Sequence, residues 1–443
     1  MMKKLLITVA VVATSIISIK AQGTKATPIE RELKADINRA AGMFYALSTA
    51  KPYKDTPAPK GKKPFYINHY GCTGPYYLDK SEYYTETYAT LLKADTLGKL
   101  TPLGHDVLRQ VHLLYQDAQD RAGELTLRGA QQSRELVKQM VERFPDMFTP
   151  KGYYSVRSVV ENRSIMTMQE GLLQLSSMQQ PIIARSKASL QEQRFMDPED
   201  EELTSHRLDS ITRVTYDRFS DLNSNETRLM TSLFNDLNYV MTNIDIPKLT
   251  KQLYILAGNA QHSQVADKIN LYKIFTPEEI HQNWRKQNAW HYINYGGCTL
   301  NGGYQPYLQR ATLRNMIHMG DSVLKRYNPL MHLRYTHAPV IMSLACLLDI
   351  DGYGLHTANL DSLEDYGWAN YRIAPMGGSI MMIHYRTDRD DPDVLVKILL
   401  NGHEAKLPIE TDCAPYYHWQ DIKRYYLRKL YRYENRRFNL KKK

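Results

Sequence analysis

Three short polar turns hold the residues of this chain with the clearest potential for chemistry, and each turn follows a predicted strand. The turns are Asn68 to Pro75, Arg157-Ser158 and His337-Ala338. Arginine binds phosphate oxygens through paired hydrogen bonds, and histidine acts as a nucleophile or moves protons near neutral pH. Ligands of an open α/β sheet bind at the carboxyl ends of its strands. The sequence therefore predicts one anion-binding site that is assembled from these three turns.

The spacing of the reactive residues argues against two other kinds of site. A cysteine phosphatase loop needs an arginine after a five-residue gap from its cysteine, and the residue at that distance from Cys72 is Leu78. Neither a CxxC nor an HExxH pattern occurs, so a zinc ribbon or a zincin site has no sequence support. Thr73 could act as a nucleophile only with a base, and the sequence shows none beside it.

Strands and helices alternate around these turns. The sequence predicts strands at Phe65–Ile67, Tyr153–Val156, Leu330–Tyr335, Ser379–Arg386 and Val394–Leu400, the last ending in a hairpin turn at Asn401-Gly402. It predicts helices from Thr101, from about Glu161 and over Ile341–Leu348, and we expect Glu161 and Glu170 to lie on a solvated face. This order predicts an α/β core in two pieces, 22–164 and 326–443, with a mainly helical insertion at 165–325.

The first residues of the chain have the pattern of a secretory signal peptide. A basic start, Met1 to Lys4, precedes an apolar run from Leu5 to Ile19, and Ala21 is a suitable cleavage site. A buried first helix is the alternative, but the run opens the chain and is short for a membrane span. We therefore expect residues 1–21 to be removed and the protein to be secreted or periplasmic. No later segment is apolar for eighteen residues, so no transmembrane segment is predicted in the mature chain.

Positive charge is concentrated at the carboxyl end. The chain has 443 residues, is 43% hydrophobic and 23% charged, and carries a formal charge of +10, a composition that excludes wholesale disorder. Lys423 to Lys443 holds ten Lys or Arg residues and one acid, Glu434, so this tail accounts for nearly all of the charge. Its aromatic residues favour a surface helix packed on the body over a nucleic-acid or lipid patch. We therefore expect no nucleic-acid partner.

Four cysteines are too few for a disulfide-dense scaffold. Cys72, Cys298, Cys346 and Cys413 allow three pairings in an oxidising compartment, and sequence does not separate them. Cys346 lies in the apolar run from Leu344 to Leu348 and is expected to be a free core residue.

Several segments resemble the histidine acid phosphatases, in particular the secreted phytases and multiple inositol polyphosphate phosphatases. Residues 66–77 (YINHYGCTGPYY) stand where members read roughly YISHYGRHGSRY, and Leu100 to Gly104 keeps their LTPLG. Asn294 to Pro306 (NYGGCTLNGGYQP) is similar to their NYGPCPLNGGIQP. The resemblance covers nearly the whole mature chain. It implies a phosphoglycerate-mutase-like three-layer α/β core with a parallel-rich central sheet and an inserted helical cap.

The resemblance also implies a reaction and shows where this chain departs from it. In the family a histidine attacks phosphorus, arginines clamp the phosphate, and an acid beside a second histidine protonates the leaving alcohol, without metal or cofactor. Thr73 stands at the nucleophile position, Cys72 and Tyr76 stand at two arginine positions, and Ala338 stands at the acid position. Pro339 stands where some relatives have a glutamate instead.

Two positions implied to bind phosphate are kept, namely Arg157 and His337. His69 could replace the missing nucleophile, but relatives also have a histidine there, so a structural role is favoured. We therefore expect a catalytically impaired pseudophosphatase that binds a phosphorylated small molecule, with inositol phosphates as candidates. The alternatives are an active phosphomonoesterase with a rearranged site and an interaction protein without enzymatic activity.

Overall fold

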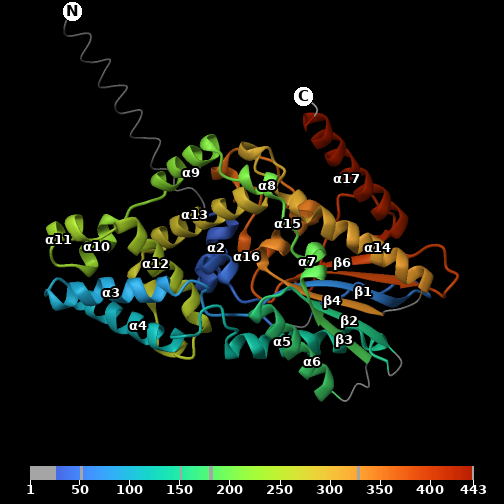
Figure 1. Cartoon of the computed structure of the whole chain (residues 1–443), viewed down its shortest axis with the longest axis horizontal. Helices are drawn as coiled ribbons and strands as arrows, with labels where there is room; N and C mark the ends of the chain where they lie inside the picture. Colours follow the sequence, from blue (N-terminus) through green and yellow to red (C-terminus); the bar gives the residue numbers. More distant parts are fainter. Residues whose placement is uncertain (1–25, 50–52, 150–151, 179–182, 327–329, 442–443) are drawn as a thin grey trace, which may run out of the picture.

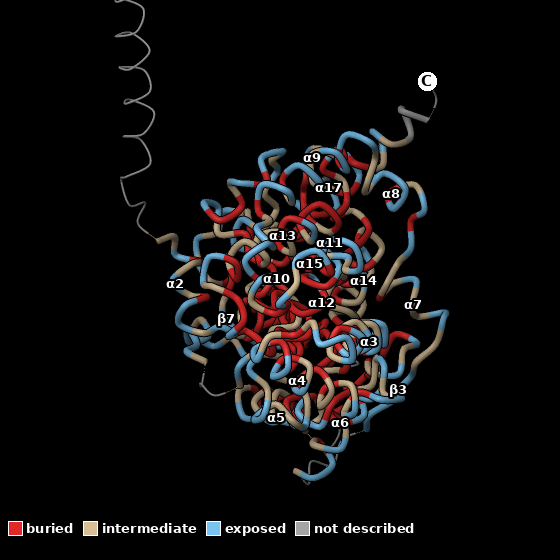
Figure 2. Tube along the Cα trace, turned by 90° about the vertical axis from the view of Figure 1, so that its left-hand side faces the viewer, coloured by how far each residue is buried: buried red, intermediate tan, exposed pale blue. Residues whose placement is uncertain are grey.

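The computed structural model describes residues 26–49, 53–149, 152–178, 183–326 and 330–441. The predicted signal peptide, residues 1–21, lies outside the described residues. A mixed sheet with helices on both faces forms one side of the molecule, and a helical body forms the other (Figure 1). Buried residues run through the interior of both parts, and exposed residues lie on the outside (Figure 2).

The central sheet has eight strands in the order β3-β2-β4-β1-β5-β6-β7, with β8 beside β6. The strands are β1 Lys63–Cys72, β2 Tyr153–Ser158, β3 Ile183–Ala188, β4 Met331–Thr336, β5 Ser379–Arg386, β6 Leu395–Leu400, β7 His403–Glu404 and β8 Tyr416–His418. The first four are parallel to one another, and β5 to β8 pair antiparallel. The hairpin predicted at Asn401-Gly402 is present, and both residues have positive φ as a tight hairpin turn requires.

β1 lies at the centre of this sheet and is longer than the sequence predicted. The strand continues through residues 68–72, which were expected to form a turn. Gly71 does not end it, because the backbone there pairs with Tyr335 of β4 on one side and Ser379 of β5 on the other. Cys72 pairs with Thr336, and Ser158 of β2 pairs with Tyr335. The carboxyl ends of β1, β2 and β4 are therefore level with one another.

Helices cover both faces of the sheet and give the core three layers (Figure 1). On one face lie α5 (Leu127–Arg143) and α6 (Asn162–Ser177), and on the other lie α14 (Arg310–Arg326), α15 (Ala338–Leu348) and α17 (Trp419–Lys441). Successive side chains of a strand point to opposite faces. Ile67 therefore packs on the face covered by α5 and α6, and Tyr70 and Cys72 pack on the face covered by α14, α15 and α17. The predicted fold class, an α/β core with a parallel-rich sheet, is confirmed.

The helical body has a hydrophobic core of its own, in which distant stretches of sequence meet. Residues from α3 (Glu82–Thr96) and α4 (Pro102–Ala118) pack with residues from α10 (Thr227–Leu233) and α12 (Ile246–Asn259). The boundary expected between the core and the helical insertion, at residues 164/165, falls inside α6. The strand β3 lies within 165–325 but belongs to the sheet, because α6 is the crossover between the parallel strands β2 and β3. The other helices are α2 Pro28–Ala35, α7 Leu190–Met196, α8 Glu201–Ser205, α9 Ser210–Leu222, α11 Leu237–Asn243, α13 Pro277–Tyr295 and α16 Asn370–Ile373.

The basic tail forms α17, and its aromatic stripe packs on the body as predicted. Tyr426 and Leu430 are fully buried, and the Tyr426 hydroxyl donates a hydrogen bond of 2.7 Å to the carbonyl oxygen of Leu348. All four cysteines are free thiols, and Cys346 lies in the core as predicted. Within the described ranges, no helix has the length and apolar character needed to cross a membrane.

The close approach of α5 to the turn after β1 generates a first prediction. A methyl group at Gly129 would clash with the carbonyl oxygen of Pro75, which already accepts a hydrogen bond from the Thr126 amide. We expect Gly129→Ala to lower the free energy of unfolding by about 1–3 kcal/mol, because the backbone must shift. Denaturant unfolding measures this change. Leu127→Ala, at an exposed position of the same helical turn, is the control, and an equal loss in both variants would contradict the prediction.

Candidate functional site

A pocket of about 460 Å³ opens where β1, β2 and β4 end. Its polar lining consists of Thr73, Tyr76, Asp79, Glu161, Arg163, Asp197, Arg207, Tyr295 and His337. Apolar side chains complete the wall, and Ala338 and Pro339 are among them. The predicted position of the site, at the carboxyl edge of the parallel strands, therefore coincides with a real cavity.

Backbone hydrogen bonds fix the turns that line this pocket. The amide of Thr73 donates to the carbonyl of Thr336 at 3.1 Å, and the amide of Gly377 donates to the carbonyl of Thr73 at 2.8 Å. These bonds tie the turn after β1 to β4 and to the segment before β5. His337 occupies the cap position before α15, and Arg163 lies in the first turn of α6. Thr73, Arg163 and His337 thus come from segments that follow β1, β2 and β4.

The imidazole of His337 bridges two carboxylates. Its Nδ1 lies 2.9 Å from an oxygen of Glu161, and its Nε2 lies 3.3 Å from an oxygen of Asp197. Burial lowers the pKa of His337, but the hydrogen bonds and charges of Asp197 and Glu161 outweigh burial and raise that pKa to about 9. At neutral pH His337 is therefore an imidazolium that donates both of its N–H groups.

Arg163 is held by acids in the same way. It pairs with Asp79, and with Glu161 at 2.5 Å, and its guanidinium lies 4.3 Å from the centre of the Tyr76 ring. Burial raises the pKa of the Asp79 carboxyl even though Arg163 lowers it. The pKa of Glu161 is lowered overall, because His337 and Arg163 outweigh the effect of burial. The cation of α6 is therefore already neutralised within the protein.

The charged groups of the pocket balance one another. Arg207 is the third cation, and its Nε donates to the side-chain oxygen of Gln305 at 3.1 Å. Three carboxylates, Asp79, Glu161 and Asp197, face Arg163, Arg207 and the protonated His337. A pocket built to hold a free phosphate has an excess of positive charge, and this pocket does not.

The structure brings together four of the six residues singled out from the sequence. Thr73, Tyr76, His337 and Ala338 line the pocket. Cys72 does not, because it faces the core, where its thiol donates to the carbonyl of Pro375 at 2.8 Å and burial raises its pKa to about 12.

Arg157 also lies outside the pocket lining. Its guanidinium donates to the carbonyl of Arg185 in β3 at 3.0 Å and lies 3.8 Å from a carboxylate oxygen of Glu192. The side chain points along the sheet face that carries Arg334, since the two residues are paired across β2 and β4. The arginine that the pocket does contain, Arg163, was not singled out from the sequence. The available signal was its place in the first turn of the helix that follows β2.

Three further acidic side chains have partners that the sequence did not predict. Glu161 was expected on a solvated helix face, but it is about one quarter exposed and binds both His337 and Arg163. Asp197 does not follow a strand and was not singled out from the sequence, but it contacts His337 from the end of α7. Glu170 pairs with Arg134 on α5 instead of facing solvent alone.

His69 takes no part in the pocket. Its ring packs against Tyr335 and lines a separate cavity between the sheet and α5. Burial lowers the pKa of His69 to about 3, with a further contribution from Arg334, so the ring is neutral. The structural role favoured from the sequence agrees with this setting.

The match to a family model now decides the relationship. Residues 117–401, well over half of the chain, match the histidine phosphatase superfamily (branch 2). The chain belongs to this family. The matched segment begins after the turn that holds Thr73 and Tyr76, and it includes Arg163 and His337. A comparison with curated proteins found no match.

Solved structures of similar fold agree with the family assignment. The multiple inositol polyphosphate phosphatase of Bifidobacterium longum, in complex with inositol hexasulfate, has a TM-score of 0.73 at 14% identity, covering 87% of this chain and 97% of its own. The phytase from D. castellii has a TM-score of 0.64 at 13% identity, covering 93% of this chain and 89% of its own. At this identity the similarity establishes the histidine phosphatase fold.

The bridged imidazolium of His337 generates a prediction about stability and pH. A group whose pKa rises on folding stabilises the folded state fully below its unfolded value and loses that effect as pH rises through the folded value. We expect the difference in free energy of unfolding between wild type and His337→Gln to be largest near pH 6. It should shrink as pH rises from 6.5 toward 9. Denaturant unfolding across this range measures the difference.

The control for this experiment is His403→Gln, which alters an exposed histidine of β7. A difference for His337→Gln that stays constant from pH 6 to pH 9, or grows, would refute the protonated bridge.

Proposed function

We propose that this protein is a catalytically impaired histidine phosphatase that binds a phosphorylated small molecule instead of hydrolysing it. The observation that carries the proposal is the pairing of His337 with two carboxylates in a pocket where threonine occupies the nucleophile position. Support comes from the charge state of each group that a phosphatase reaction would require.

The nucleophile is the first requirement that the pocket does not meet. An imidazolium has no free lone pair, so His337 can neither attack phosphorus nor take the proton of the Thr73 hydroxyl. His337 is the one histidine among the described residues that line the pocket. Thr73 is therefore left with carboxylates as bases, and these carboxylates are engaged with His337, Arg163 or both.

The acid is the second requirement. Ala338 follows His337 directly and offers only a methyl group, and Pro339 has no proton to donate. General acid catalysis contributes about 10²- to 10⁴-fold in rate, and loss of a covalent nucleophile adds further orders of magnitude. The protonated His337 could donate a proton to a leaving alcohol, but this does not help a reaction that has no attacking group.

Binding remains compatible with the pocket, although it must compete with internal ion pairs. A phosphate group can draw Arg163 and His337 toward itself only by displacing carboxylate oxygens, whereas Arg207 is held by the amide of Gln305. Because burial raises the pKa of Asp79, this carboxylate loses its charge at a higher pH than a free aspartate, which weakens one of the two acids that hold Arg163. We therefore expect affinity to rise as pH falls. Inositol phosphates are the first candidates, given the inositol hexasulfate bound to the Bifidobacterium longum relative.

The experiment measures phosphate release and binding on the same preparations. We expect purified mature protein to release no phosphate from phytate or p-nitrophenyl phosphate above background between about pH 4 and pH 8. We expect it to bind phytate in calorimetry, more tightly at pH 5 than at pH 7. Arg163→Gln should weaken that binding at least tenfold, because it removes a bidentate donor from the pocket.

Arg157→Gln is the matched control, because it removes the same group outside the pocket lining. Thermal melts of both variants establish that they are folded. Phosphate release that Arg163→Gln abolishes would support an active phosphomonoesterase with a rearranged site and would refute the proposal. Absence of binding at either pH would favour an interaction protein. Equal losses in the two variants would place the ligand elsewhere.

We also propose that the protein is exported and loses residues 1–21. The basic start, the apolar run and Ala21 support this proposal. Expression in a bacterial host with a working secretion pathway should yield a periplasmic or secreted protein whose first residue is Gln22. Intact-mass measurement and N-terminal sequencing check the cleavage. An intact amino terminus on cytoplasmic protein would contradict it.

A further inference from the structure

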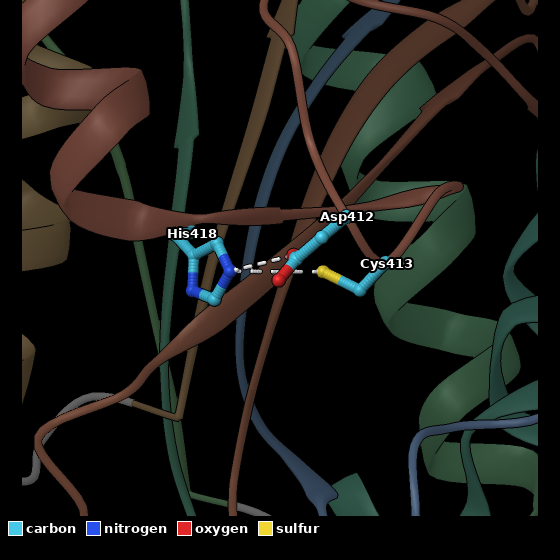
Figure 3. Close-up of side chains that lie close together, drawn as sticks. All are labelled: Asp412, Cys413 and His418. Carbon is cyan, nitrogen blue, oxygen red and sulfur yellow. Dashed lines mark hydrogen bonds and ion pairs between the residues drawn. The ribbon is translucent and has the colours of Figure 1, made fainter.

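A group of three different metal-ligating side chains lies around the short strand β8. Asp412 and Cys413 belong to the loop before the strand, and His418 is its last residue. Figure 3 shows the carboxylate and the thiol on the same side of the imidazole ring, both facing one of its nitrogens. Among the described residues, these three side chains form the one group of at least three His, Cys, Asp or Glu residues with metal-binding spacing.

The distances between the three groups suit a small cation. Nε2 of His418 lies 3.0 Å from Oδ1 of Asp412 and 4.0 Å from Sγ of Cys413. All three atoms lie within 4.8 Å of one another. Tetrahedral Zn²⁺, with bonds of about 2.3 Å to sulfur and about 2.0 Å to nitrogen, separates those two atoms by roughly 3.6 Å. The observed distance from nitrogen to sulfur therefore differs from that value by a few tenths of an ångström.

A second carboxylate orients the histidine. Nδ1 of His418 donates to Oδ1 of Asp393 at 2.6 Å, which leaves Nε2 directed toward Asp412 and Cys413. Asp393 is itself held by Lys62, whose Nζ lies 3.1 Å from its other oxygen. Histidines that bind metals commonly donate their second ring nitrogen to a carboxylate in this way, and the contact fixes the tautomer.

The loop that carries Cys413 is held in place by its own hydrogen bonds. The hydroxyl of Thr411 lies 3.3 Å from the sulfur, and it donates to the carbonyl of Tyr416 at 2.8 Å. Cys413 is also the one free cysteine that is not fully buried. The thiol is therefore preorganised and open to ions from solvent, unlike the three cysteines inside the protein.

We propose that Asp412, Cys413 and His418 form a Zn²⁺ site with an open fourth position. Thiolate, imidazole and carboxylate together suit Zn²⁺ better than Mg²⁺ or Ca²⁺, which prefer oxygen ligands alone. Binding displaces the thiol proton of Cys413 and the proton on Nε2 of His418, and these protons pass to solvent. Three protein ligands leave one position for water or for a group of another molecule.

This site is separate from the pocket that holds Thr73. Lys62, which holds Asp393, directly precedes β1, and Thr73 directly follows it. The ten residues of β1 span about 30 Å in extended form. Loss of the metal site and loss of phosphate binding are therefore distinguishable in experiment.

The test uses the purified mature protein after chelator treatment and reduction. Titration with Zn²⁺ in competition with a chromophoric chelator should give one site per chain. Cys413→Ala and His418→Gln should each weaken Zn²⁺ binding more than about 100-fold, and Asp393→Asn should weaken it about 10- to 100-fold. Co²⁺ should produce a thiolate-to-metal absorption band that Cys413→Ala removes while leaving the protein folded.

His403→Gln controls for adventitious binding at an exposed histidine. Thermal melts in the presence of chelator show whether each variant is folded, and Cys413→Ala alters a loop, so it isolates ligation from folding. Zn²⁺ affinity that is equal in wild type and Cys413→Ala, or a Co²⁺ complex without the thiolate band, would overturn the site. The group would then be an ion-paired histidine between Asp393 and Asp412.

Discussion

The shared imidazolium of His337 is the interaction on which the character of the pocket depends. It joins the start of α15 to Glu161 before α6 and to Asp197 after α7. Two carboxylates around one ring keep the ring protonated, and the protonated ring in turn helps to lower the pKa of Glu161. Arg163 then completes the set through Glu161 and Asp79. The pocket is organised around its own ions rather than around an empty space for phosphate.

The level ends of β1, β2 and β4 explain why residues that follow these three strands line one pocket. Three turns after three strands meet at one edge of the sheet whenever the strands are parallel and neighbours. Position along a strand, however, decides which side chains reach that edge. Arg157 still belongs to β2, so its side chain follows the sheet face, whereas Arg163 lies in the first turn of α6 and points into the cavity. Residue type alone does not separate two arginines six positions apart.

Other features required information that local sequence does not carry. The extent of β1 depends on partners on both sides, which pair the backbone through Gly71 where an isolated segment would turn. The helical body unites α3 and α4 with α10 and α12, which are more than a hundred residues away. The Asp412, Cys413 and His418 cluster matches no standard metal motif, because the turn into β8 sets its geometry. Its strongest support, Asp393, comes from a different loop.

The internal charge balance of the pocket has a consequence for redesign. A histidine placed at position 73 would stand among Asp79, Glu161 and Asp197, which repel an incoming phosphate, and beside a ring that stays protonated. Removal of one carboxylate would free a cation but would leave threonine at position 73. A variant designed to attack phosphorus from this pocket therefore needs substitutions at position 73 and at a carboxylate together.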